Sequence, residues 1–348
     1  MLKALFICAS RLPLPLLHAI GVAIGWLAYR WSSSFRAHID RNMAQAGYAD
    51  PALRRRAAYE IGKAMAELPA IWLRPLDQVA GLVRETQGWE LIEAAQAAGR
   101  PIVFLTPHLG CFEITAQTYA HRTPAAKPIT VLYRRPRQAA FTPLIESGRG
   151  RPNMRLAPAD VSGVRALMRA LKNGEAVGLL PDQTPRFGEG VWAPFFGRPA
   201  FTMTLVRRLI RSGRALVLLA YAERFPHGRG YRLIIQSFDE ALSESEATAA
   251  AQINRALEAL IRRLPMQYLW NYNRYKIPPG VEPPPVAAPS DVKADAAAVA
   301  METATAPTSN APAPVADALA AVADISAGTE ANPPTDTSAA SQRPARQA

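Results

Sequence analysis

The stretch PIVFLTPHLGCFE, residues 101–113, holds the strand-to-helix transition that decides the fold. Its first five residues form a short apolar run, which is typical of a buried strand. Pro107 and Gly110 interrupt that run, and a helical pattern follows over residues 111–121. His108 therefore falls just past the carboxyl end of a strand, where open α/β sheets bind ligands.

The same alternation of short apolar runs and helical patterns continues through the chain. Further buried strands are predicted at 129–132, 176–180, 215–221 and 231–238. Helices are predicted at 51–72, 88–98, 111–121, 138–149, 161–173, 202–212 and 246–263. This order predicts an α/β fold in which helices flank a largely parallel central sheet.

The amino-terminal segment, 1–31, contains the run LPLPLLHAIGVAIGWLAY at 12–29. Eighteen residues without Lys, Arg, Asp or Glu reach the lower limit of a bilayer-spanning helix, so we expect a membrane-anchoring or interfacial helix. A cleaved signal peptide fits poorly, because the run ends in the bulky residues Tyr29, Arg30 and Trp31. A buried core helix remains open.

The carboxyl-terminal segment, 281–348, is rich in Pro, Ala, Ser and Thr and reads as a disordered tail. It carries eight acidic and three basic residues, so residues 1–280 have a net charge of +17. A segment with this positive charge attracts polyanions: anionic lipid, phosphorylated substrates, an acidic carrier protein or nucleic acid. Nucleic acid is poorly supported, because no recognised nucleic-acid-binding module accompanies the charge. The main folded domain is expected at 32–280, and the absence of a disulfide framework suits a reducing compartment.

His108 and Glu113 are candidates for acid–base chemistry. In one continuous helix their five-residue spacing would turn the two side chains about 140° apart, so they meet only if His108 lies in the loop. A histidine held by a carboxylate is a general base that takes a proton from a hydroxyl near neutral pH. Alternatively, His108 caps the helix and Glu113 favours its positive end, and spacing alone favours this interpretation.

Four further motifs follow in order. They are Tyr133-Arg134-Arg135-Pro136, Leu180-Pro181-Asp182-Gln183, Pro194-Phe195-Phe196-Gly197 and Gln267-Tyr268-Leu269-Trp270. Together with His-x4-Glu, they resemble the lipid A biosynthesis (late) acyltransferases, the lauroyl and myristoyl transferases of Gram-negative bacteria. The resemblance spans most of residues 1–280.

The resemblance implies a glycerolipid-acyltransferase-like fold and transfer of a fatty acyl chain from acyl carrier protein to a hydroxyl of a lipid A precursor. It places the catalytic domain at the cytoplasmic face of the inner membrane, with His108 as base and Glu113 as its partner. Neither metal nor cofactor is implied, because a thioester needs no metal to be attacked by an activated hydroxyl.

The other motifs supply candidate substrate contacts. Arg134 and Arg135 suit phosphates or a developing oxyanion, with a solvated basic turn as the alternative, and the resemblance favours substrate contact. Asp182 and Gln183 also follow a strand end, so we expect them on the same rim as His108, with a turn-forming Asp as the alternative. The segment Phe195-Phe196-Gly197 offers apolar bulk for an acyl chain or is ordinary core.

The chain departs from the family pattern at two places. Cys111-Phe112 stands where many members have Asn-Trp, and Cys111 raises the alternative of an acyl-cysteine intermediate. The run Trp270-Asn271-Tyr272-Asn273-Arg274 differs from the usual Trp-x-His-Arg-Arg, which leaves the acceptor open. A transferase acting on a lysophospholipid and a non-catalytic protein that binds anionic lipid are therefore retained as alternatives.

Overall fold

The computed structural model describes residues 2–134, 148–211 and 214–284 of the 348-residue chain. Six helices precede the first strand of this described part: α1 (Leu2–Ser10), α2 (Leu14–Trp31), α3 (Ser33–Gln45), α4 (Pro51–Ala66), α5 (Leu68–Leu73) and α6 (Leu76–Ala80). Strands and helices then alternate: β1 (Val83–Gln87), α7 (Trp89–Ala97), β2 (Ile102–Leu105), α8 (Phe112–Arg122), β3 (Ile129–Tyr133), β4 (Met154–Pro158), α10 (Val161–Lys172) and β5 (Ala176–Leu179). The described chain ends with β6 (Gly190–Phe195), β7 (Arg198–Met203), α11 (Leu205–Ile210), β8 (Leu216–Arg224), β9 (Tyr231–Ser237) and α12 (Glu246–Arg263), with short 3-10 turns at 226–228 and 265–267.

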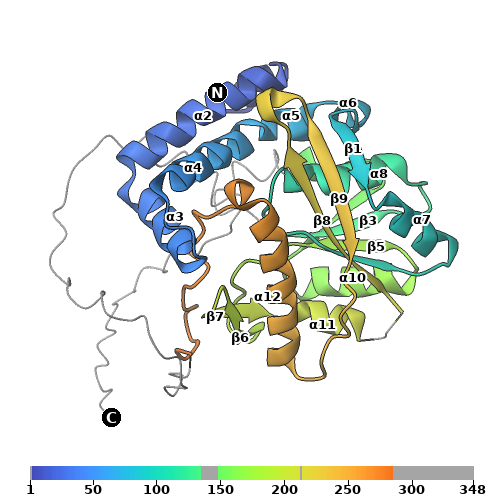
Figure 1. Cartoon of the computed structure of the whole chain (residues 1–348). Helices are drawn as coiled ribbons and strands as arrows, with labels where there is room; N and C mark the ends of the chain where they lie inside the picture. Colours follow the sequence, from blue (N-terminus) through green and yellow to red (C-terminus); the bar gives the residue numbers. More distant parts are fainter. Residues whose placement is uncertain (1, 135–147, 212–213, 285–348) are drawn as a thin grey trace, which may run out of the picture.

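Within the described residues, the central sheet has seven strands in the order β1-β9-β8-β2-β5-β3-β4. The five strands from β8 to β4 are mutually parallel, while β9 runs antiparallel to β8 and β1 runs parallel to β9. The largely parallel sheet flanked by helices is thus confirmed (Figure 1). All five parallel strands end at one edge, and β2 and β5 lead there to His108 and Asp182.

The sheet separates two hydrophobic cores. Successive strand side chains point to opposite faces, so Val103 and Val177 join one core while Phe104 joins the other. The first core also takes residues of α4, α10 and α12, and the second takes residues of α5, α7 and α8. Because β2 and β5 are buried over their whole length, they read as continuous apolar runs.

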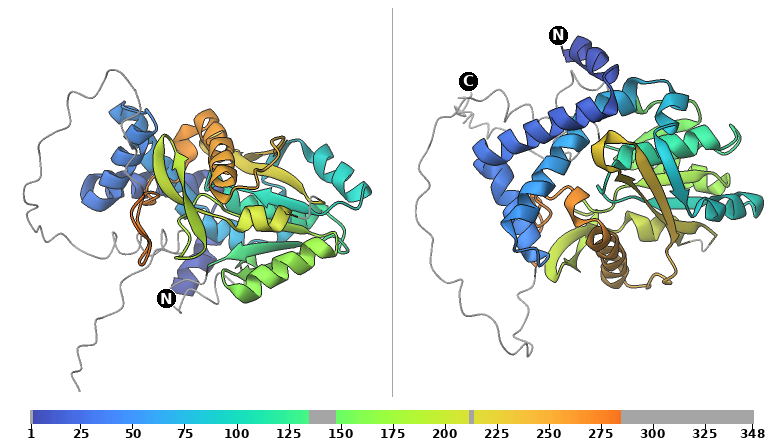
Figure 2. Two further views of the ribbon diagram at one scale, coloured as in Figure 1. Left: turned by 90° about the horizontal axis from the view of Figure 1, so that it is seen from below. Right: turned by 45° about the horizontal axis from the view of Figure 1, so that its top comes forward.

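Helix α2 is the predicted helix at 12–29, and it packs on α4 through glycines (Figures 1 and 2). A Cβ at Gly25 would lie 2.2 Å from the Ala58 carbonyl oxygen, and one at Gly62 would lie 2.0 Å from the Gly21 carbonyl oxygen. The two backbones therefore touch, which only glycine permits. No helix in the described ranges combines the length and the apolar character needed to cross a bilayer. Anchoring by this segment stays a prediction.

The sequence missed four strands and misplaced one helix. The hairpin of β6 and β7 contains Pro194 and Pro199, and proline argues against a strand in a sequence pattern. The hairpin forms a two-stranded sheet of its own, so both of its strands are edge strands, and edge strands tolerate proline. Residues 202–203, expected in a helix, belong to β7. The helix predicted at 138–149 falls mostly, and the tail at 281–348 almost wholly, outside the described residues.

Candidate active site

Three backbone hydrogen bonds hold the loop after β2. The Thr106 backbone N–H donates to the Leu179 oxygen at 3.0 Å, which extends the pairing of β2 with β5. Further on, the His108 carbonyl accepts from Leu269 at 3.1 Å, and the Gly110 N–H donates to Gln267 at 3.0 Å. The Gln267-Tyr268-Leu269-Trp270 motif therefore braces the loop that carries His108.

Gly110 lets this loop turn into α8. Its φ is 61°, and a Cβ there would lie 1.9 Å from the Ala222 carbonyl oxygen. Any other residue would have to push β8 away or change the turn. The turn leaves His108 in the loop and Glu113 in the first turn of α8, as the sequence predicts.

His108 is paired with Asp182. The ring Nδ1 lies 2.8 Å from Asp182 Oδ1, and the His108 backbone N–H donates to Oδ2 at 2.9 Å. Both residues are buried, at 4% and 2% exposure. A carboxylate only accepts, so the proton sits on Nδ1 and Nε2 carries the lone pair. Asp182 thus lies on the same rim as His108, as expected.

Gln183 and Tyr268 surround this pair. The Gln183 amide nitrogen lies 3.0 Å from His108 Nε2, where it donates to the ring. Burial acts to raise the pKa of Asp182, but the electrostatic attraction of His108 and its two hydrogen bonds outweigh burial and leave this pKa below its ordinary value. Burial and the charge of Asp182 raise the pKa of Tyr268, so this phenol stays protonated.

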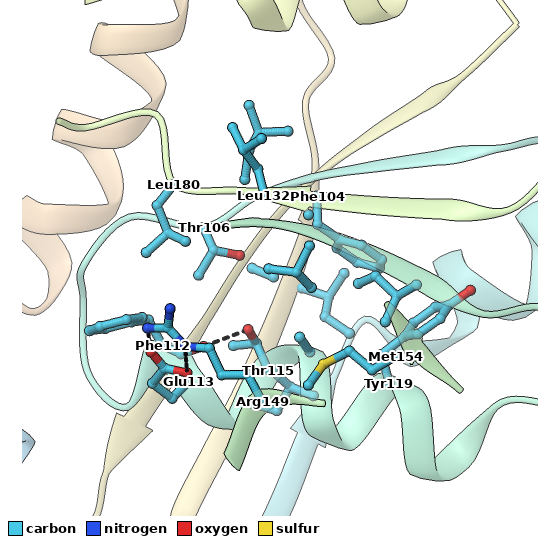
Figure 3. A pocket seen from close by; sticks show the side chains of 18 of the residues that line it. Phe104, Thr106, Phe112, Glu113, Thr115, Tyr119, Leu132, Arg149, Met154 and Leu180 are labelled. Atoms are coloured by element: carbon cyan, nitrogen blue, oxygen red, sulfur yellow. Dashed lines mark hydrogen bonds and ion pairs between the residues drawn. The ribbon is translucent and has the colours of Figure 1, made fainter. Parts of the chain in front are cut away.

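Glu113 has different partners from those expected. Among the described residues, its carboxylate accepts from Trp72 Nε1 at 3.2 Å and from Arg149 Nε at 3.0 Å, with a second bond from Arg149 Nη2. The guanidinium also lies 5.4 Å from the centre of the Trp72 ring. His108 is not among these partners, and in this structure Asp182 occupies the place at Nδ1 that was expected for Glu113. The direction of the Glu113 side chain explains this difference, because it points from α8 toward Arg149 (Figure 3).

Two cavities meet beside His108. The inner cavity lies between α8 and the sheet, and its mostly apolar lining includes Phe104, Tyr119, Ile129, Val131 and Met154 (Figure 3). The outer cavity includes His108, Gln183, Arg134, Asp160, Glu189 and Arg208 in its lining. Four described residues line both: Phe112, Leu132, Arg149 and Leu180. An apolar chain and a polar, anionic group could therefore meet at this junction.

Arg134 lies on the outer cavity, and its Nη2 donates to the Thr184 carbonyl at 3.1 Å. That bond ties the end of β3 to the loop after β5, beside Gln183. Arg135, the other predicted anion-binding residue, lies outside the described residues.

The contacts of Phe195, Phe196 and Gly197 fit ordinary core packing better than contact with an acyl chain. The two rings are buried and stack edge to face at 4.8 Å, and Phe196 also lies 5.8 Å from Trp270. Gly197 follows in the β6–β7 turn with φ 75°. None of the three is among the described residues that line the two cavities. The structure places them in the core behind the outer cavity.

Cys111 sits at the amino-terminal cap of α8 and is buried. Burial and the nearby Glu67 carboxylate raise the pKa of its thiol well above the ordinary value. The thiolate is the nucleophilic form of cysteine, so this environment disfavours an acyl-cysteine intermediate.

Behind the loop lies a buried ionic group that the sequence did not reveal, here called the back cluster: His18, Glu67, Arg224 and Tyr231. Arg224 Nη2 donates to Glu67 at 2.7 Å and to the Gly110 carbonyl at 2.7 Å. His18 Nε2 and the Tyr231 hydroxyl each lie 3.0 Å from the same carboxylate. Arg149 was also missed. No periodicity marks these residues, because they come from segments far apart in sequence.

Comparisons with known proteins show the family to which the chain is similar. A family model described as "Bacterial lipid A biosynthesis acyltransferase" matches residues 2–277. The lipid A biosynthesis lauroyltransferase of Escherichia coli (strain K12) is 27% identical over 277 residues, which cover 77% of this chain and 88% of that protein. The palmitoleoyltransferase of the same strain is 27% identical over 279 residues, with the same coverage. Its myristoyltransferase is 25% identical over 213 residues, covering 60% and 63%. The family match includes the loop, the described lining of both cavities and the back cluster.

Proposed function

The chain belongs to the bacterial lipid A biosynthesis acyltransferases, and we propose that it transfers a fatty acyl chain from acyl carrier protein to a hydroxyl group of a lipid A precursor. The observation that carries this proposal is the His108–Asp182 pair, which stands beside the junction of an apolar cavity and one lined by charged and polar side chains.

His108 is proposed as the general base. Asp182 holds the proton on Nδ1 and stabilises the imidazolium that forms, while Nε2 faces Gln183. When the acceptor hydroxyl replaces the Gln183 amide at Nε2, its proton passes to the ring and its oxygen attacks the thioester carbonyl. The carbon–sulfur bond then breaks, and the departing thiolate takes the proton back from His108.

Arg149 and Glu113 are proposed to act together. Arg149 lines both cavities, so its guanidinium would stabilise the negative charge that develops on the thioester oxygen at their junction. Glu113 and Trp72 hold that guanidinium in place. The direct pairing of Glu113 with His108 remains a prediction, and the contacts of the described residues support the role through Arg149 better.

The two cavities are proposed to separate the two substrates. The inner cavity takes the acyl chain, since its lining is mostly apolar, and the outer cavity takes the polar part of the acceptor. Arg134 and Arg208, together with Arg135, which follows Arg134 in the sequence, would pair with phosphate groups of the precursor. Gln183, which lines the outer cavity, would contact the acceptor directly, whereas Asp182 would act through His108. The Phe195-Phe196-Gly197 turn would support the wall of the outer cavity.

Attachment to the inner membrane is proposed through the outward side of α2. Leu16, Ile20, Trp26 and Trp31 are exposed there at 46%, 39%, 50% and 64%. Apolar and tryptophan side chains on one side of a helix favour the interface of a bilayer. We propose that the catalytic domain then faces the cytoplasm.

Acyl carrier protein is proposed to deliver the acyl chain, because the net positive charge of residues 1–280 attracts an acidic protein. The acyl thioester is a substrate, and the scheme needs no metal or cofactor because an activated hydroxyl attacks a thioester directly. Nucleic acid plays no part in it.

Mass spectrometry of lipid A tests the proposal. Lipid A from a strain that lacks this protein should miss one acyl chain, and a plasmid copy of the wild-type chain should restore it. A copy carrying His108→Ala should not restore the chain although it accumulates to the same level.

The same strain separates the remaining alternatives. If the lipid A profile stayed unchanged and the phospholipid profile changed, the acceptor would be a lysophospholipid instead of a lipid A precursor. Full restoration by His108→Ala would contradict the mechanism and favour a non-catalytic binding protein.

A further inference from the structure

Gly178 occupies an unusual place in the sheet. It lies in the buried strand β5, between Phe104 of β2 and Val131 of β3, and it lines the inner cavity. Glycine weakens the interior of a strand, so its presence there often marks the close approach of another group.

The backbone does not require glycine at this position. Unlike several other glycines of the described residues, Gly178 does not have a positive φ. A Cβ built on it would lie 3.5 Å from Ile129 Cδ1 and 3.7 Å from Val131 Cγ2, both ordinary contacts. Gly110 differs sharply, since a Cβ there would collide with the Ala222 oxygen at 1.9 Å. The missing side chain at 178 therefore leaves space that a side chain could fill.

That space lies part-way down the inner cavity. The parallel strands run toward His108, so Leu180 stands at the mouth that both cavities share. Gly178 is two residues further back, about 7 Å along the strand. Ile129 and Met154 are paired at the first residues of β3 and β4, at the end of the strands away from His108, and they line the deeper part of the inner cavity. Figure 3 shows Met154 well away from Leu180.

We propose that the side chain at position 178 sets the longest acyl chain that the inner cavity accepts, and that glycine leaves its full depth open. This inference rests on the proposed function, because it needs the inner cavity to hold the donor's acyl chain. It assigns chain-length selection to one residue of the sheet, away from the reacting atoms.

Turnover with saturated acyl donors of increasing length tests the inference. The full-length enzyme, Gly178→Ala and Gly178→Leu would each be assayed with acyl carrier protein loaded with chains that differ by two carbons. For Gly178→Ala we expect kcat/KM to fall about tenfold for the longest chain that the wild type uses well. Shorter chains should lose less than about twofold, and Gly178→Leu should move the preferred length further down.

Two further variants support the measurement. Val177→Ile also adds one carbon to β5 but on the opposite face, toward the other core, so it should leave the chain-length profile unchanged. Met154→Ala removes bulk at the deep end and should raise kcat/KM for donors longer than the preferred one.

The outcomes separate the inference from the function on which it rests. An unchanged profile in Gly178→Ala, or an equal loss at every chain length, would overturn the inference while acyl transfer by the wild type still stood. If the wild type transferred no acyl chain to the lipid A precursor, the proposed function itself would fail.

Discussion

Buried ionisable groups lie on both sides of the loop that follows β2, but the two groups differ in their partners and in their access to a cavity. On one side, His108 faces Asp182 and Gln183 and lines the outer cavity. On the other side, Glu67 of the back cluster accepts hydrogen bonds from Arg224, His18 and Tyr231, all of them buried. Among the described residues, His108 Nε2 is contacted by the neutral Gln183 amide, which the acceptor hydroxyl replaces in the proposed scheme.

This difference shows that buried charge by itself does not identify a catalytic site. Burial acts to raise the pKa of Glu67, but Arg224 and His18 outweigh burial and hold it far below its usual range. Such a carboxylate stays ionised and has its partners satisfied, so it stabilises the loop rather than moving protons. Access to a cavity distinguishes His108 from it.

Replacing the base should have the largest effect. We expect His108→Ala to lower kcat about 10⁴-fold, because the hydroxyl then has no proton acceptor. The melting temperature should also fall, because buried Asp182 loses its partner at Nδ1 and keeps only the bond from the backbone N–H of residue 108. Both enzymes are therefore assayed at a temperature at which circular dichroism shows them folded. His121→Ala is the matched control, because His121 is exposed in the last turn of α8. A His108→Ala enzyme that kept a tenth of the wild-type kcat would contradict the comparison.

Breaking the back cluster should act on stability. Arg224→Met leaves the Glu67 carboxylate buried without its main partner, and we expect the free energy of unfolding to fall by about 3–5 kcal/mol. Urea denaturation would measure it. The double variant Arg224→Met with Glu67→Leu removes both charges and should be more stable than Arg224→Met alone. If the double variant were the less stable of the two, the cluster would not behave as a closed ion pair.

The pairing of Glu113 with Arg149 should give an intermediate effect. We expect Glu113→Gln and Arg149→Lys each to lower kcat about 10²-fold, as for loss of one group that stabilises transition-state charge. Because both are proposed to act through one guanidinium, the double variant should lose little more than either single variant. Fully additive losses would instead support an independent role for Glu113 at His108.

Acid pH should produce the smallest effect. The folded-state pKa of Asp182 is lowered, so its ionised form stabilises the fold fully above its unfolded-state pKa of about 3.9, and this stabilisation is lost as pH falls through the lower folded value. The difference in unfolding free energy between the wild type and Asp182→Asn should therefore shrink as the pH is lowered below about 4. A difference that grew toward acid pH would contradict the ionised pair.

Much of the fold was readable because buried parallel strands leave apolar runs. The runs ending at Leu105 and Leu179 predicted both the strands and the shared rim of His108 and Asp182. The partner of Glu113 was not readable, because it depends on side-chain direction and on Arg149, 36 residues further along the chain. The role of α2 was also hidden, since its contact with α4 depends on glycines that hydropathy does not distinguish.

The wall that the two cavities share bears on how a reaction cycle would end. In the proposed scheme the hydrocarbon chain enters as part of the donor and, once the ester forms, lies in the same place as part of the product. Phe112, Leu132, Arg149 and Leu180 border both spaces, so the product would leave by withdrawing its new chain past them. Each methylene withdrawn into water costs about 0.8 kcal/mol, which slows release of longer chains. The bilayer would offset that cost by receiving the chain directly.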